Sequence, residues 1–278
     1  EYVKAFGGVV AQHAQEPRLT EGAQMHEGAV SAELGLTGWP SVAEESIIAR
    51  DVLLAEHVGS RVHICHLSTA GSVEIVRWAK ARGISVTAEV TPHHLLLTDE
   101  LVRSYDSVYK VNPPLRTESD VLALREALID GTIDIIATDH APHTREEKAQ
   151  TYFKAPSGLP LVQHSLQVLL DLVAQGVLTL ETAVERACHA PAVLFGVEGR
   201  GFVREGYWAD LVVVDPKKPY TVRTGNILYQ CGWSPLEGHT FGSTIERTFV
   251  NGACVFEDGQ IRPDAPKGMR LTFDGNCR

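Results

Sequence analysis

The alternation of short apolar runs with helical segments is the feature of this sequence that most restricts its fold. Three apolar runs of strand character, residues 61–67, 84–90 and 133–138, are separated from one another by segments with helical periodicity. Strands that alternate with helices of roughly 10 to 15 residues are typical of βαβ units, because a pair of parallel strands needs a long crossover connection. The first two-thirds of the chain therefore predict an α/β fold built on a parallel sheet.

The helical segments carry recognisable start and stop signals. The segment 41–58 begins at Ser41, and Glu44 occupies the position that would complete a capping box with it. Glycines such as Gly131 follow other segments, at the position where a left-handed backbone most often ends a helix. Further helices are expected over residues 72–82, 120–130, 161–175 and 179–188.

The character of the sequence changes after about Phe202. Short apolar runs are now separated by Asn251-Gly252 and Asp258-Gly259, dipeptides that favour tight turns between antiparallel strands. No long helical pattern is evident in this part. We expect residues 1–202 to form an α/β catalytic domain and residues 203–278 to form part of a small all-β domain.

Charge and cysteine usage exclude several classes of protein. The formal net charge of −10 disfavours a nucleic acid or an anionic membrane as partner. No apolar run approaches the roughly 18 residues that span a bilayer, and the first residues do not resemble a signal peptide. The cysteines are odd in number and scattered, which favours reduced thiols and a cytoplasmic location. They are Cys65, Cys188, Cys231, Cys254 and Cys277.

Side chains that can bind metals follow the apolar runs. His13, His66 and Asp139 each stand where a strand is expected to end. In parallel α/β barrels such positions meet at one open face, and imidazoles with a carboxylate are suitable ligands for Zn²⁺. A lone histidine at a strand end is nevertheless more often a structural hydrogen-bonding group. Spacing alone also leaves His93 and His94 open as ligands or as loop residues.

The segment Asp139-His140-Ala141-Pro142-His143 is the strongest local signal. It places three ionisable groups within five residues, directly after an apolar strand. Desolvating such groups is costly, so their presence at this point indicates a functional site.

This segment resembles the corresponding DHAPH motif of dihydroorotases, which are metal-dependent cyclic amidohydrolases. Other segments resemble the same family in the same order, and the resemblance covers nearly the whole chain. It implies an α/β fold with a (β/α)8 TIM-type barrel, here partial, together with a piece of a small β-sandwich. The other segments are CHLST at 65–69, TPHHL at 91–95, NPPLR at 112–116, APSG at 155–158 and GYWADLVVVD at 206–215.

The resemblance also implies a site for two Zn²⁺ ions. It makes His13 and His66 ligands of the second ion, and it makes Asp139 both a ligand of the first ion and the catalytic proton carrier. His140 matches the motif without a catalytic role, and His93 and His94 become structural or supporting residues. Substrate binding falls to a separate set of residues: Asn112, His143, Ser157 and Gly158.

The reaction implied is the reversible cyclisation of N-carbamoyl-L-aspartate to L-dihydroorotate, a step in pyrimidine biosynthesis. The chain is expected to bind this small-molecule substrate. A homodimer is left open as its oligomeric state. Two alternatives also remain: a related cyclic amidase (hydantoinase, dihydropyrimidinase or allantoinase) or a catalytically silent structural paralogue. The complete DHAPH and NPPLR segments disfavour the first, and the retained His13, His66 and Asp139 disfavour the second.

One family feature is missing from the sequence. The H-x-H-x-R motif, which supplies two metal ligands and an arginine for the substrate carboxylate, does not occur, and Lys4 is poorly placed to supply the group that bridges the metals. The expectation from the sequence is therefore a chain truncated before Glu1. Residues 1–278 alone are expected to be a poor enzyme.

Overall fold

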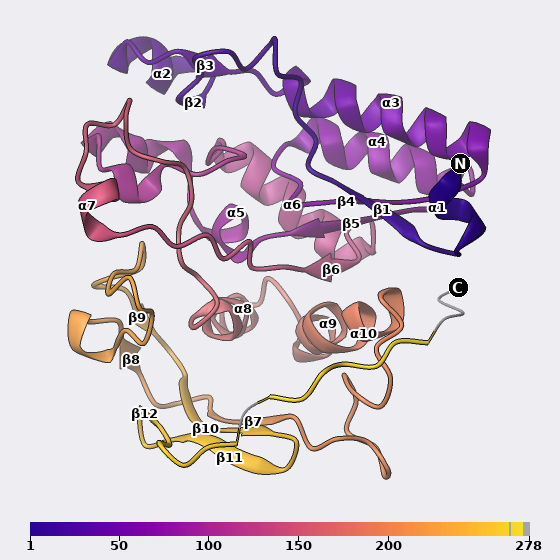
Figure 1. Cartoon of the computed structure of the whole chain (residues 1–278). Coiled ribbons are helices and arrows are strands. Elements are labelled where there is room, and N and C mark those ends of the chain that lie inside the picture. Colours follow the sequence, from indigo (N-terminus) through magenta and orange to yellow (C-terminus); the bar gives the residue numbers. More distant parts are fainter. Residues whose placement is uncertain (267, 275–278) are drawn as a thin grey trace. The chain divides into compact units, whose positions relative to one another are not determined.

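The computed structural model describes residues 1–266 and 268–274, and they divide into two compact units (Figure 1). The first unit comprises Glu1–Gln163 and Tyr229–Pro235. The second comprises His164–Leu228 and the described part of Leu236–Arg278. This division rests on contacts in space, whereas the boundary expected at residue 202 rests on a change in sequence character. The division by contacts does not test that boundary, which stays a prediction.

The first unit is built on a four-stranded parallel sheet. Its strands are β1 (Val9–Gln12), β4 (Arg61–Ile64), β5 (Val86–Val90) and β6 (Ile135–Ile136), and they lie in the order β1-β4-β5-β6. All three neighbouring pairs are parallel. The spatial order thus follows the order in the chain, as in an arc of a (β/α) barrel, whereas a doubly wound sheet reverses direction at a switch point.

Three long helices provide the crossover connections of this sheet. They are α3 (Val42–Val58), α4 (Ala70–Ala81) and α6 (Glu118–Asp130), and Figure 1 shows α3 and α4 running side by side. Each helix buries an apolar stripe while its other faces carry charged residues, which is the pattern of a helix packed on a sheet. The buried stripes include Ile48 and Val52, Val73 and Val76, and Leu124 and Leu128.

The start of α3 differs from the expected capping box. Ser41 has helical backbone angles (φ −57°, ψ −38°) and its side chain caps no backbone N–H. Glu44 is 2% exposed and accepts hydrogen bonds from the backbone N–H of Ser68 and the hydroxyl of Ser72 instead. Ser41 occupies the N-cap position as expected, but the predicted capping box does not form because tertiary partners, absent from the local sequence, hold the carboxylate of Glu44.

Shorter elements complete the first unit. Between β1 and α3, β2 and β3 form a small parallel pair that flanks α2. Two 3₁₀ helices, Asp99–Ser104 and Ser107–Tyr109, follow α5. The remaining bounds are α1 (Tyr2–Ala5), β2 (Met25–His26), α2 (Ala29–Leu34), β3 (Gly38–Trp39), α5 (Pro92–Leu96) and α7 (Arg145–Lys148).

The second unit combines helices with an antiparallel sheet in the order β12-β11-β10-β7. This sheet and a second strand pair, β8 with β9, confirm the β-rich character expected after residue 202. A five-residue π-helix, Glu185–His189, joins α9 to α10. The bounds are α8 (Ser165–Ala174), α9 (Leu180–Val184), α10 (Ala190–Leu194), β7 (Leu211–Asp215), β8 (Tyr220–Thr221), a 3₁₀ helix (Thr224–Asn226), β9 (Thr240–Phe241), β10 (Thr244–Val250), β11 (Ala253–Glu257) and β12 (Gln260–Ile261).

Two expectations about the chain as a whole can be compared with the structure. Within residues 1–266 and 268–274, no helix is both long enough and apolar enough to cross a membrane. Four cysteines in this part are free thiols, namely Cys65, Cys188, Cys231 and Cys254. Cys277 lies outside the described residues.

Substitutions in α6 test the packing assigned to the core of the first unit. Leu124 is 1% exposed and Leu122 is 49% exposed, so the same substitution can be made on opposite faces of one helix. We expect Leu124→Ala to lower the free energy of unfolding by about 2–5 kcal/mol, because it removes buried methyl groups and leaves a cavity. Leu122→Ala should change it by less than about 1 kcal/mol. Urea denaturation followed by circular dichroism measures both, and equal losses would contradict the assigned packing.

Candidate metal and substrate site

The structure brings two of the expected metal ligands into direct contact. His13 follows β1 and His66 follows β4, so both stand at the carboxyl ends of neighbouring parallel strands. Nδ1 of His13 lies 2.9 Å from Nε2 of His66, and the two rings meet edge to face. Two imidazole nitrogens at this separation can point at one cation.

Gln15 determines which nitrogen of His13 is available. Its side-chain oxygen lies 3.1 Å from Nε2 of His13, and its amide nitrogen donates to the hydroxyl of Thr20 at 2.7 Å. Because an amide oxygen only accepts, Nε2 of His13 must carry the proton, and the lone pair of Nδ1 faces His66. Histidines that ligate metals are oriented in this way, with the second ring N–H donated to a fixed acceptor.

The backbone is strained at two of the expected site residues. His66 has a φ of 35° and Asp139, which follows β6, has a φ of 44°. Non-glycine residues in this region cost of the order of 1–3 kcal/mol and cluster at functional sites. The positive φ of His66 ends the regular alternation of side chains along β4. The face of the sheet on which His63 lies therefore does not predict the face on which His66 lies.

Asp139 acts on His66 through its charge, although within residues 1–266 and 268–274 its carboxylate does not form a close three-ligand group with His13 and His66. Burial lowers the pKa of His66 and the adjacent His13 lowers it further, while the carboxylate of Asp139 opposes both effects. His66 is 7% exposed, and its Nδ1 has no hydrogen-bond partner among the described residues. The arrangement therefore favours a neutral imidazole, the form that binds a metal ion.

A second polar cluster lies inside the sheet next to His66. His63, Cys65 and Glu89 offer ligand atoms that all lie within 4.8 Å of one another. His63 contacts the hydroxyl of Thr87 at 2.9 Å and the carboxylate of Glu89 at 3.0 Å, and Glu89 also accepts the backbone N–H of His66 at 3.3 Å. Burial raises the pKa of the Cys65 thiol to about 11, and the charge of Glu89 adds to this rise. Sequence analysis assigned no role to Glu89, although a carboxylate in an apolar strand was the available signal.

The two histidines that follow β5 have different environments. His94 contacts the hydroxyl of Thr91 at 2.8 Å, and its Nε2 lies 3.2 Å from the carbonyl oxygen of Pro113. It thereby fixes the loop that begins at Asn112, which supports a structural role. His93 is 1% exposed and neither of its ring nitrogens has a hydrogen-bond partner among the described residues.

The four expected substrate residues lie on loops that contact one another or the metal-ligand region. The side-chain nitrogen of Asn112 donates to the oxygen of Gln15 at 3.3 Å, which links this residue to His13. Nε2 of His143 donates to the carbonyl oxygen of Ser157 at 3.0 Å. Gly158 has a φ of 132°, and a Cβ there would lie 2.7 Å from the carbonyl oxygen of Ala141, so only glycine fits.

The remaining histidine of the DHAPH segment is structural in its contacts. Nδ1 of His140 accepts the backbone N–H of Leu161 at 3.1 Å, and its ring stacks at a tilt against Tyr229 with centroids 5.2 Å apart. These contacts fix the position of the segment against Leu161 and Tyr229, and the lack of a catalytic role for His140 stays a prediction.

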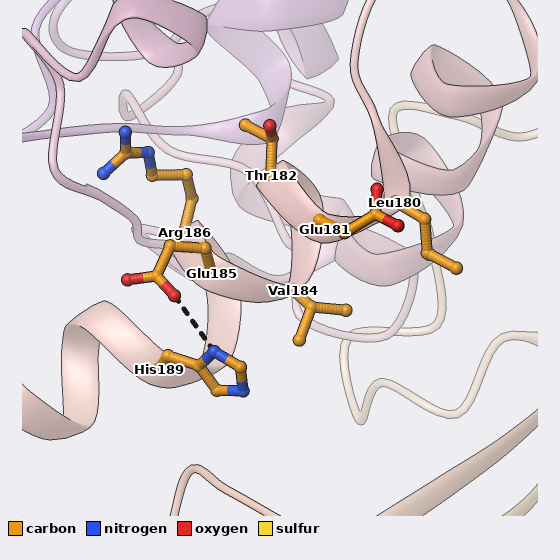
Figure 2. A pocket seen from close by; sticks show the side chains of 7 residues that line it. All are labelled: Leu180, Glu181, Thr182, Val184, Glu185, Arg186 and His189. Carbon is orange, nitrogen blue, oxygen red and sulfur yellow. Dashed lines mark hydrogen bonds and ion pairs between the residues drawn. The ribbon is translucent and has the colours of Figure 1, made fainter.

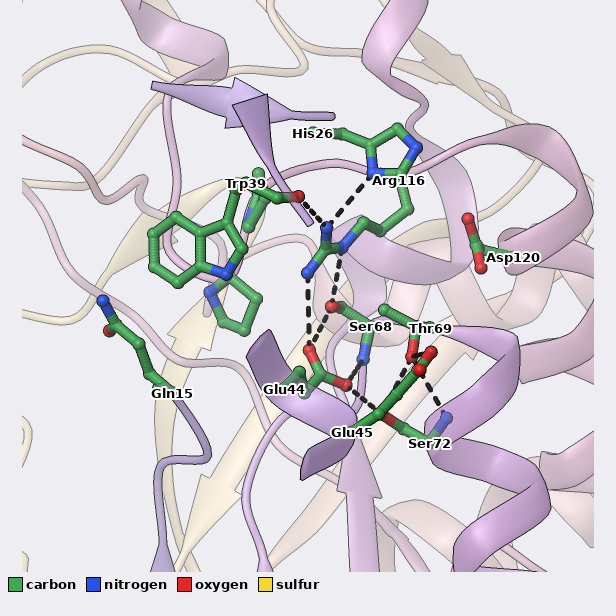
Figure 3. A network of polar contacts seen from close by, with 12 residues as sticks. Gln15, His26, Trp39, Glu44, Glu45, Ser68, Thr69, Ser72, Arg116 and Asp120 are labelled. Atoms are coloured by element: carbon green, nitrogen blue, oxygen red, sulfur yellow. Dashed lines mark hydrogen bonds and ion pairs between the residues drawn. The ribbon is translucent and has the colours of Figure 1, made fainter. Parts of the chain in front are cut away.

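A buried arginine joins the loops around this region (Figure 3). Arg116 is 1% exposed, and its guanidinium donates to the hydroxyl of Ser68 at 3.0 Å and the carbonyl oxygen of Trp39 at 2.9 Å. It also donates to Nδ1 of His26 at 3.1 Å and lies 3.8 Å from the carboxylate of Glu44. The NPPLR segment was recognised from the sequence, but the role of its arginine was missed because every partner is distant in the chain.

A hollow of about 580 Å³ on the second unit has a different character (Figure 2). It is lined by residues of α9 and the π-helix, where Nδ1 of His189 lies 3.0 Å from the carboxylate of Glu185. These two residues are one helical turn apart and both side chains are partly exposed. The pair is an ordinary ion pair of a helix surface, and none of the expected site residues lines this hollow.

Comparison with known proteins identifies the family. The model of the amidohydrolase family matches residues 8–255. The dihydroorotase of Streptomyces coelicolor is 60% identical over 263 residues, and that of Mycobacterium tuberculosis is 48% identical over 264 residues. Each match covers 94% of this chain and 61% of the relative. The chain belongs to the amidohydrolase family, and the resemblance to dihydroorotases is confirmed. The chain spans about 61% of the length of these relatives.

Solved structures agree on the fold. The L-hydantoinase (dihydropyrimidinase) from Arthrobacter aurescens is 27% identical with a TM-score of 0.84, covering 99% of this chain and 61% of that one. The dihydropyrimidinase from Brevibacillus agri is 23% identical with a TM-score of 0.81, covering 92% and 58%, and shows the fold alone. The expected fold class, a TIM-barrel-type α/β fold with an additional β-sheet region, is confirmed.

The Arg116 network leads to a prediction about stability. Arg116→Met should lower the free energy of unfolding by about 3–5 kcal/mol, because it leaves the carboxylate of Glu44 buried without a cation. The double variant Arg116→Met/Glu44→Gln should lose less than the sum of the two single losses. Arg82→Met breaks an exposed pair with Glu56 and should cost less than about 1 kcal/mol. Urea denaturation measures each value, and strictly additive losses would argue against the buried pair.

The same network predicts sensitivity to acid. Burial, with the charge of Arg116 adding to it, lowers the pKa of His26 from 6.5 to about 4. The unfolded chain therefore binds a proton on His26 at a higher pH than the folded one does. The contribution of His26 to stability is thus fully present above pH 6.5 and is lost as the pH falls towards 4. His26→Asn keeps an acceptor for Arg116 but does not titrate, so its stability should decline less, by at most about 3 kcal/mol over this range. Denaturation at pH 7 and pH 4 compares the two proteins, and parallel declines would rule out His26 as the cause.

Proposed function

We propose that the full-length gene product is a zinc-dependent dihydroorotase, which interconverts N-carbamoyl-L-aspartate and L-dihydroorotate in pyrimidine biosynthesis. The observation that carries the proposal is the pairing of His13 and His66, whose ring nitrogens lie 2.9 Å apart at the strand ends of a chain 60% identical to a relative named dihydroorotase. Asp139 follows the next-but-one strand of the same sheet, β6, at the same edge.

The donor set fits a zinc ion. In this proposal Nδ1 of His13 and Nε2 of His66, which lie 2.9 Å apart, would supply two nitrogen ligands and Asp139 would supply an oxygen ligand, a combination of donor types that suits Zn²⁺. Gln15 supports it by fixing the tautomer of His13. A bound zinc ion supplies Lewis-acid chemistry to the amide carbonyl of the substrate. We include a second zinc ion in the proposal on the resemblance to dihydroorotases.

The protein's own acid–base group in this proposal is Asp139. In ring closure its carboxylate would remove a proton from the ureido nitrogen as this nitrogen bonds to the carboxyl carbon, and the C–O bond that breaks releases hydroxide, which leaves with that proton as water. In hydrolysis water adds to the same carbon, the C–N bond breaks, and Asp139 would pass a proton from the water to the leaving nitrogen. The strained backbone at Asp139 supports the proposal, because a φ of 44° aims the side chain from the strand end in a direction that a regular extension of β6 would not give.

Substrate binding is assigned to the loops around Asn112 and Ser157. The side-chain oxygen of Asn112 is buried and has no hydrogen-bond partner among the described residues, so an N–H group of the substrate can be its partner. The lack of a Cβ at Gly158 lets this loop pack closely against Ala141 and His143, because a Cβ there would lie 2.7 Å from the carbonyl oxygen of Ala141. Together with His143, these residues would hold the substrate in the orientation that proton transfer requires.

A related cyclic amidase is the second candidate. The solved structures with the same fold include hydantoinases and a dihydropyrimidinase, at 23–27% identity in the cases described. The relatives named dihydroorotase are 48–60% identical over 94% of the chain, which favours dihydroorotate as substrate. A catalytically silent paralogue is disfavoured by the retention of His13, His66 and Asp139.

Substitutions at the two ends of β6 test the proposal. Asp139→Asn should lower turnover of dihydroorotate by at least about 100-fold, because it removes the proton carrier. Asp134 precedes β6 and pairs with Lys80 at 2.7 Å, so Asp134→Asn should lower stability and leave turnover within about twofold. Loss of dihydroorotate is followed with added Zn²⁺, using the full-length gene product. A wild-type protein that opened hydantoin or allantoin but not dihydroorotate would overturn the substrate assignment.

A further inference from the structure

A buried lysine lies between the loops assigned to the substrate. Lys148 is the last residue of α7 and is only 4% exposed. Its ammonium donates to three backbone carbonyl oxygens, those of Pro156 and Gly158 at 3.0 Å each and that of Lys110 at 3.2 Å. An ammonium group has three N–H donors, so this set of carbonyls satisfies all of them.

The three carbonyls belong to two segments that are distant in the sequence. Pro156 and Gly158 flank Ser157, and Lys110 stands two residues before Asn112. The two segments also share a direct hydrogen bond, from the backbone N–H of Gly158 to the carbonyl oxygen of Lys110 at 2.9 Å. One ammonium therefore joins both segments that carry the assigned substrate residues.

The surroundings of Lys148 make the burial of its charge energetically costly. Its ammonium lies 5.7 Å from the ring centroid of Trp233. Burial, with the charge of Lys110 adding to it and that of Asp106 opposing it, lowers the pKa of Lys148 to about 8. Lys110 has separate partners, since its own ammonium donates to Gln24 at 2.7 Å and to the carbonyl oxygen of Tyr152 at 2.8 Å. A lysine buried against carbonyls rather than a carboxylate indicates a positioning role for its charge.

We propose that Lys148 is a positioning residue that fixes Ser157 and Gly158 relative to Asn112, so that the two loops grip the substrate together. The proposal rests on the function proposed above for its effect on substrate binding. The clamp itself depends only on the contacts of the ammonium.

The test compares Lys148→Met with Lys154→Met in the full-length gene product. Methionine keeps a long apolar side chain and removes every donor, while Lys154 is exposed on the same segment and serves as the control. Hydrogen exchange of residues 157–159, measured by mass spectrometry, should become at least about tenfold faster in Lys148→Met and stay unchanged in Lys154→Met. Equal exchange in the two variants would overturn the clamp.

Kinetic measurements then show whether Lys148 positions the substrate loops or only supports the structure. Lys148→Met should raise KM for dihydroorotate about tenfold and leave kcat within about twofold and the zinc content unchanged, because it weakens binding of substrate and transition state alike. Faster exchange with an unchanged KM would overturn the positioning role. If the wild-type protein does not turn over dihydroorotate, the proposed function fails, and the exchange measurement still decides whether the clamp exists.

A measurement on the native protein covers the case in which Lys148→Met does not fold. Between pH 7 and pH 9 the ammonium becomes an amine, which has one N–H donor fewer. After correction for intrinsic rates, exchange of residues 157–159 should accelerate more than exchange of α6. Equal acceleration of both segments would overturn the clamp.

Discussion

The guanidinium of Arg116 is the group on which the loops at the carboxyl edge of the sheet depend. It contacts the loop after β4 through Ser68, the β2–β3 segment through Trp39 and His26, and the start of α3 through Glu44. A buried cation needs several partners to offset its desolvation, and here they come from three parts of the chain: the β2–β3 pair, the start of α3 and the loop after β4. The burial of one charge thus ties these three parts together.

Strain at the strand ends is compatible with this support. His66 and Asp139 both have positive φ, a conformation that persists only where surrounding contacts determine it. At His66 those contacts include the carboxylate of Glu89, which accepts the backbone N–H, and the ring nitrogen of His13. The cost of the strained backbone at His66 is offset by hydrogen bonds, one of them to Glu89, a residue outside the assigned ligands.

Basic residues are fewer than acidic ones in this chain, and two of the lysines are buried against backbone carbonyl groups. Lys110 and Lys148 are 7% and 4% exposed, and most of their hydrogen bonds are to backbone oxygens. Such contacts order loops that have no regular secondary structure, at a cost of desolvation that lowers the pKa of both lysines. The loops assigned to the substrate are therefore held by charged groups instead of by a sheet or a helix.

Local patterns in the sequence predict the main strands and helices of the first two-thirds of the chain and the residues that follow each strand. Periodicity is a local property, and parallel strands must place their carboxyl ends at one edge, so His13, His66 and Asp139 could be named as candidates, and the resemblance to dihydroorotases added their roles. Only the tertiary structure decided the partners of Glu44, Arg116 and the other buried polar groups. Their contacts join residues tens of positions apart, and no local pattern specifies which distant carboxylate or carbonyl a buried charge will meet.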